Sequence, residues 1–155
     1  MIEVMREREI PAAPEDLWPV VSDPARLADW FAFAEGAEVI EGEPGVGQRR
    51  RMHGSWGRKK SEIDQRIVEW EPPRRLTWEH EAEGLDGKPA PRFAAETRFS
   101  IELEPAGGRL TRVRLTSRQV PASKPRDLVI RAFGKREVGG KLDASLERLA
   151  ALVTQ

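Results

Sequence analysis

The chain contains no cysteine and no tyrosine among its 155 residues, and only two histidines, His53 and His80. The absence of cysteine excludes disulfides, thiolate nucleophiles and cysteine metal ligands. Two histidines leave little basis for a histidine-ligated site, so we expect no metal and no cofactor. Neither a glycine-rich phosphate loop nor a Gly-x-Ser-x-Gly elbow occurs, which removes two common signals for dinucleotide binding and serine hydrolysis.

Net charge is also absent, because 26 basic residues balance 26 acidic ones. Such a balance gives no electrostatic reason to bind nucleic acid or an anionic membrane, and neither partner is expected. No apolar run approaches the ~20 residues of a membrane span. Residues 1–8 are charged where a signal peptide would be apolar. We therefore expect a cytoplasmic protein, and the abundance of Arg, Ala, Glu and Pro indicates a GC-rich, bacterial coding sequence.

Much of the chain alternates between apolar and charged residues, the period of two that indicates β-strands. A slip of this phase between Ile67 and Val68 predicts a bulge. The first strand is polar enough for the edge of a sheet. Short turns join most of the later strands, which predicts an antiparallel sheet with one apolar and one charged face. The predicted strands are 2–10, 37–41, 48–55, 61–70, 75–81, 93–103 and 111–118.

Two short helices are predicted between the first and second strands. Pro14 suits the first turn of one helix, because its missing N–H is not needed there. Asp23 is expected to cap the second helix, with Pro24 at its first position. The apolar face of this second helix comprises Leu27, Trp30 and Phe31.

Residues 123–155 have the pattern of one long helix. Apolar residues recur at steps of three and four from Val138 to Val153, whereas Lys141 is expected to lie mostly on another side. Glycines at 134, 139 and 140 are unfavourable in a helix interior and predict a bend. The bend would separate a lid over a ligand cavity, 128–137, from an anchor that packs on the sheet, 138–153.

These elements together predict an α+β fold of a single domain spanning residues 1–155. A curved antiparallel sheet would wrap around the long C-terminal helix, with the two short helices closing one end. The element order is one strand, two helices, about six strands and one helix.

Several segments resemble the START-like (SRPBCC) proteins, which share the helix-grip fold. These segments are 8–18, 22–24, 30–31 and 69–78. The resemblance covers essentially the whole chain, and the polyketide cyclase/dehydrase branch is the most similar. The Hsp90-ATPase-activator-like branch is similar in its Trp-Phe and Pro-Pro-Arg-Arg-Leu segments. The motifs are a helix start, a turn and a strand start, so they indicate the fold without deciding the function.

The resemblance implies a cavity between the concave sheet face and the C-terminal helix. His80, Arg50 and Glu137 are the candidates for catalysis there, since they could move protons or bind a polar group. His80 could equally be a half-exposed strand-end residue, and Glu137 a surface carboxylate. Trp30 and Phe31 could be a ligand gate or anchors of the core. The predicted ligand-binding residues are Trp30, Phe31, Met52, Trp78, His80, Thr97, Phe99, Leu115, Ile130 and Phe133.

Three functions are compatible with this pattern. The first is binding of a small hydrophobic molecule by a carrier, sensor or scavenger, including lipid transport, which needs only a preformed apolar cavity. The second is a cyclase or aromatase acting on a polyketide-like chain. The third is an interaction module like the Hsp90 co-chaperone relatives, in which the cavity is merely a packed core. A homodimer could form through the first strand or the outer sheet face.

Overall fold

In the computed structural model, the description covers residues 1–56, 58–89, 94–129 and 134–154. The first 30 residues form β1 (Ile2–Ile10), α1 (Pro14–Val21), the 3₁₀ turn η1 (Pro24–Arg26) and α2 (Leu27–Trp30). The strands that follow are β2 (Gly36–Glu41), β3 (Arg49–Trp56), β4 (Lys59–Glu71), β5 (Arg75–Leu85), β6 (Lys88–Pro89), β7 (Ala94–Pro105) and β8 (Thr111–Pro121). The chain closes with helices α3 (Lys124–Val129) and α4 (Lys135–Val153).

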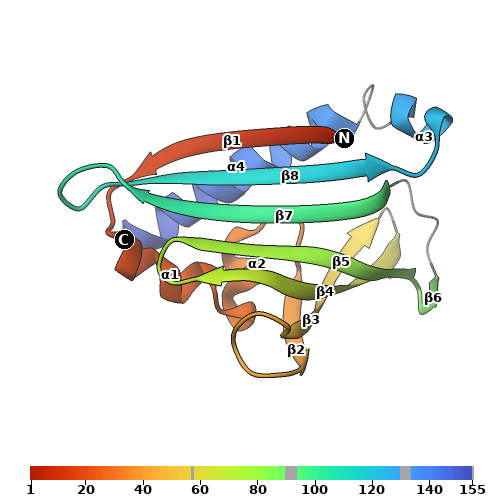
Figure 1. Ribbon diagram of the computed structural model, residues 1–155, viewed down its shortest axis with the longest axis horizontal. Coiled ribbons are helices and arrows are strands. Elements are labelled where there is room, and N and C mark those ends of the chain that lie inside the picture. Colours follow the sequence, from red (N-terminus) through yellow and green to blue (C-terminus); the bar gives the residue numbers. More distant parts are fainter. Residues whose placement is uncertain (57, 90–93, 130–133, 155) are drawn as a thin grey trace.

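The described strands form one antiparallel sheet in the order β1-β8-β7-β5-β4-β3-β2, with β6 paired to β5 (Figure 1). The long helix α4 crosses behind the sheet and packs mainly against β1 and α2. The predicted helix-grip arrangement is confirmed, as is the edge position of the first strand. The predicted strand 75–81 is too short, because β5 continues to Leu85, and the short strand β6 also lies before the next predicted strand. Within the described residues, no helix is long and apolar enough to cross a membrane.

Two local features predicted from the sequence, a bulge and a helix cap, are present in the structure. The pairing of β4 with β5 shifts register between Ile67 and Glu69, where the phase slip predicted a bulge, and again between Asp64 and Gln65. The side chain of Asp23 accepts a hydrogen bond from the backbone N–H of Ala25 at 2.9 Å. This cap begins η1, which passes directly into α2, and so it directs Trp30 and the following residues under the sheet.

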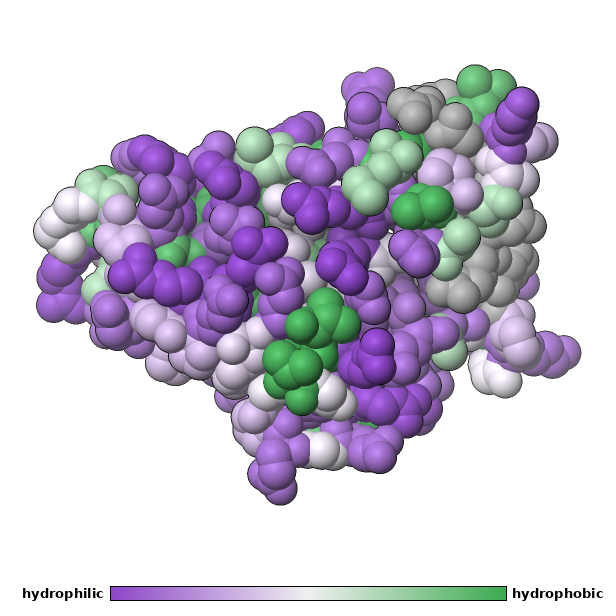
Figure 2. Space-filling model, in the orientation of Figure 1, coloured by the Kyte–Doolittle hydropathy of each residue, from purple (hydrophilic) through white to green (hydrophobic). Residues whose placement is uncertain are grey.

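The outer face of the sheet is covered by charged side chains (Figure 2). Arginines and glutamates alternate across β1, β8, β7, β5 and β4. Each exposed pair contributes little by itself, but a connected network keeps every charge near an opposite one. The connected chain of ion pairs runs from Glu9 through Arg112, Glu7, Arg114, Glu102 and Arg75 to Glu69, with N–O distances of 3.1 to 3.9 Å.

The C-terminal region differs from the prediction of one helix over 123–155. Its described helical residues belong to two helices, α3 and α4, and residues 130–133 between them lie outside the described ranges. The predicted division at Gly139 and Gly140 does not appear, because α4 continues as one helix through both. Gly139 instead allows a close approach. A Cβ there would lie 2.4 Å from a guanidinium nitrogen of Arg6, which forms an ion pair with Asp143 at 3.4 Å.

These surroundings predict different effects on stability for alanine at the two neighbouring glycines, Gly139 and Gly140. Gly140→Ala should raise the free energy of unfolding by about 0.5–1 kcal/mol, because alanine favours a helix and nothing described lies within 4 Å of the new Cβ. Gly139→Ala should gain less or destabilise, because Arg6 must move away from Asp143. Urea unfolding of the two variants and the wild type measures both effects. Equal stabilisation by both substitutions would show that the contact with Arg6 does not affect the free energy of unfolding.

Candidate ligand pocket

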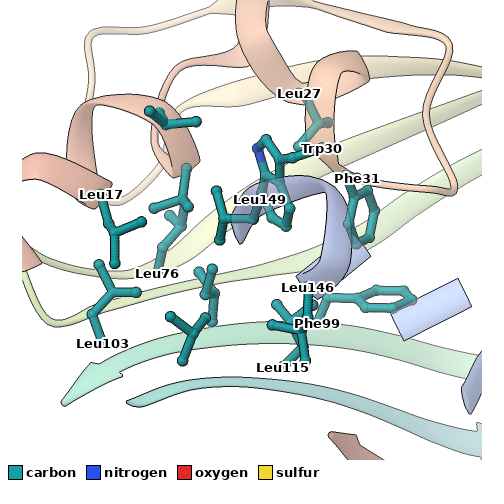
Figure 3. Packing of buried hydrophobic residues seen from close by; sticks show 14 of the residues in the cluster. Leu17, Leu27, Trp30, Phe31, Leu76, Phe99, Leu103, Leu115, Leu146 and Leu149 are labelled. Atoms are coloured by element: carbon teal, nitrogen blue, oxygen red, sulfur yellow. The ribbon is translucent and has the colours of Figure 1, made fainter. Parts of the chain in front are cut away.

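A cluster of aromatic side chains fills the centre of the molecule. Phe31, which follows α2, is 0% exposed. Its ring centroid lies 5.4 Å from that of Trp78 on β5 and 5.6 Å from that of Phe99 on β7, both edge to face. Figure 3 shows Leu146 and Leu149 of α4 within the same packed group. The space beneath α2 is therefore occupied by the protein's own side chains.

The open space lies farther along, where β5 and β7 separate. Their ladder runs from Arg75 paired with Glu102 to Glu79 paired with Arg98, and it stops there although both strands continue. On the concave side of this opening, beneath the first turns of α4, is a pocket of about 200 Å³. Its lining consists of Phe33, Met52, Ser55, Ser61, Ile63, His80, Glu83, Thr97, Phe99, Gln119, Val138 and Lys141.

A second hollow, of about 440 Å³, lies at the same opening among charged side chains such as Glu79, Glu96 and Arg98. His80 and Thr97 line both hollows, since each is the next residue beyond the last pair of the ladder. The imidazole of His80 also stacks on Phe99, with ring centroids 5.8 Å apart. His80 therefore stands at the boundary between the apolar pocket and the charged surface.

One cation belongs to the apolar pocket. The ammonium group of Lys141 lies 5.2 Å from the ring centroid of Phe33, a distance at which cation and ring attract each other. The Ser145 hydroxyl donates to the carbonyl of Lys141 at 2.7 Å and accepts from the N–H of Ala32 at 2.8 Å. A single buried hydroxyl thus holds the turn of α4 that carries Lys141 against the segment that carries Phe33.

Arg50 forms a separate buried polar site. It is 5% exposed, and its guanidinium donates to Gln48 Oε1 at 2.8 Å and to the carbonyl oxygen of Ser22 at 2.9 Å. Desolvation by burial lowers the pKa of Arg50 to about 10, although the nearby charge of Asp23 acts in the opposite direction. Arg50 remains charged at neutral pH, and it links β3 to the end of α1. None of the pockets described here includes it.

Residues 1–154 match the family described as polyketide cyclase/dehydrase and lipid transport. The chain belongs to this family. No curated protein matches the chain in sequence. The family assignment agrees with the helix-grip fold and with the predicted resemblance to the SRPBCC proteins.

Solved structures with the family's fold are similar along the whole chain. TTHA0849 from Thermus thermophilus has a TM-score of 0.74 and 22% identity, covering 97% of this chain and 95% of that one. Ara h 8.0201 has a TM-score of 0.73 and 16% identity, covering 99% and 97%. The di-domain ARO/CYC BexL from the BE-7585A biosynthetic pathway has a TM-score of 0.78 and 18% identity, with 99% of this chain matching 47% of that chain. At such identities the likeness shows the fold alone.

The predicted ligand-binding residues fall into three groups within this family fold. Met52, His80, Thr97 and Phe99 line the pocket. Trp30, Phe31, Trp78 and Leu115 are buried in the core and line none of the described pockets. Ile130 and Phe133 lie outside the described residues.

The predicted catalytic candidates are not brought together. Arg50 is buried beside Gln48 and Ser22, whereas Glu137 is exposed on α4. His80 alone of the three reaches the pocket. Within the described ranges, no group of three His, Asp or Glu side chains could hold a metal ion.

The sequence reasoning missed Lys141, which it assigned to a side away from the packed face. Lys141 lies three residues after Val138 and four before Ser145, so the three share a stripe along α4. Val138 and Lys141 line the pocket, and Ser145 is buried beside Ala32. The pattern alone placed Lys141 away from the packed face, because a lysine is usually exposed.

Adjacent arginines on β3 give a test of the buried Arg50. Arg50→Met should lower the free energy of unfolding by about 1–3 kcal/mol, because the carbonyl of Ser22 and the amide of Gln48 lose their donor. Arg49→Met removes exposed ion pairs with Glu41 and Glu81 and should cost less than Arg50→Met, because exposed ion pairs contribute little to stability. Urea unfolding compares the two variants. Equal losses would indicate that Arg50 contributes no more than a surface charge.

Proposed function

We propose that this protein binds a small hydrophobic molecule in the pocket between α4 and the concave face of the sheet. The observation that carries the proposal is the pocket of about 200 Å³ left open beside a filled aromatic core. Phe33, Met52 and Phe99 supply apolar surface, and the polar residues that share the lining could orient a ligand. Binding of this kind suits a carrier, sensor or scavenger and requires no chemical step.

The size of the pocket limits the ligand. A dry apolar cavity of about 150 Å³ holds one benzene ring. The pocket therefore suits a molecule of one or two fused rings or a short acyl chain. Larger ligands would have to displace aromatic side chains such as Phe31, which is fully buried among other rings.

Catalysis is the second candidate function, and His80 is the observation that favours it. Its imidazole stacks on Phe99 in the pocket and also reaches the charged hollow on the other side of the sheet. A group in that position could exchange a proton between a bound molecule and the surface. A cyclase or aromatase reaction on a polyketide-like chain would use it in this way.

A neutral fluorescent probe of two fused rings, 1-aminonaphthalene, tests binding. Its emission should shift to shorter wavelength on mixing with the wild-type protein, as it does when the probe leaves water for an apolar site. Val138→Trp should weaken probe binding about tenfold or more, because a larger side chain from α4 would fill the pocket.

Val153→Trp is the matched control. Val153 is also half-buried on α4 and packs against the core, but it lines none of the described pockets. Probe affinity should stay within about twofold of the wild type, a free-energy change well below that of a tenfold loss. If the wild type fails to bind the probe, or if both variants bind equally well, the proposed site is wrong.

A further inference from the structure

We propose that the molecule bound in the pocket is a hydrophobic acid, whose carboxylate pairs with the ammonium group of Lys141. This inference rests on the proposed function, because it concerns the same pocket. The apolar body of the ligand would lie on Phe33 and Phe99. The anionic end would then lie at the α4 side of the pocket.

The position of Lys141 distinguishes it from an ordinary surface lysine. Its side chain is half-buried and lines the pocket together with Val138, the residue one turn before it. Its ammonium group lies against the Phe33 ring at 5.2 Å. The attraction to the ring offsets part of the hydration that the ammonium loses, yet the ring cannot neutralise its charge.

Two contacts hold Lys141 and Phe33 in this arrangement before any ligand binds. Ser145 joins the Lys141 carbonyl to the N–H of Ala32, the residue preceding Phe33. On the other side, a Cβ on Gly54 would lie 3.0 Å from the carbonyl oxygen of Phe33, so a larger residue there would push this segment a few tenths of an ångström away from β3. A pre-organised cation loses little entropy when an anion arrives.

Among the described residues, Lys141 is the one Lys or Arg that lines the pocket, and Glu83 is the one Asp or Glu. No Asp or Glu of the described residues lies within ion-pair distance, 4.0 Å, of the Lys141 ammonium. Glu83 also lines the pocket, but from β5. An anion would be repelled beside Glu83 and attracted beside Lys141. A hydrogen bond between ammonium and carboxylate is stronger than one between neutral groups, and more so where water is partly excluded.

Two ligands of nearly the same shape test the inference. 2-Naphthoate and 2-naphthamide share the same ring system, and only the first is anionic at neutral pH. Isothermal titration calorimetry should show the wild type binding naphthoate at least about tenfold more tightly than the amide, as expected for one charge-assisted hydrogen bond. Lys141→Met should remove this preference and leave the affinity for the amide nearly unchanged, because methionine keeps an apolar stem of similar length.

Two further variants separate the contact from general electrostatics. Lys135→Met removes an exposed charge from the same helix and should keep the preference. Lys141→Arg keeps a cation at the pocket and should also keep the preference for naphthoate over naphthamide. Equal affinity of the wild type for both compounds, or a preference that survives Lys141→Met, overturns the inference. If the neutral probe 1-aminonaphthalene binds but naphthoate does not, the inference alone fails, and if none of the three binds, the proposed function fails with it.

Discussion

The packing of Phe31 is the contact on which the rest of the structure depends. Its ring meets rings from α2, β5 and β7 and leaves no space on the α2 side of the concave face. The remaining volume must lie toward the first turns of α4, where β5 and β7 separate. The same ring therefore fixes the short helices against the sheet and decides where a small molecule can fit. Core and pocket are two parts of one packing arrangement.

Polar groups serve different purposes on the two faces of the sheet. On the outer face, arginines and glutamates neutralise one another across five strands, which accounts for a chain with many charges and none in excess. On the concave face, charges are few, and each has a defined position. Arg50 joins β3 to α1, and Lys141 lies over an aromatic ring. The net charge of zero does not reveal this difference between the two faces.

The sequence predicted the sheet well, because alternation, turn residues and the phase slip near Ile67 are local signals that tertiary packing reinforced. It predicted the inward position of Met52 and Phe99 for the same reason. It could not decide whether Phe31 lines a cavity or fills it, because burial of a ring looks the same in sequence either way. The role of Lys141 was hidden as well. Which side of a helix faces a pocket depends on where the sheet opens, and the residues of the helix do not encode that point.

Among the described residues, only five backbone pairs join β5 to β7, all at one end of these strands. The sheet therefore consists of two groups of strands, two ribbons whose described residues are joined to each other at that end only. One ribbon is β1, β8 and β7, and the other is β5, β4, β3 and β2. Beyond these five pairs, the described residues of β5 and β7 form no backbone ladder, and the contacts between the two ribbons are made by side chains. A molecule bound in the pocket, as we propose, would add to that packing and would make the open end of the sheet stiffer.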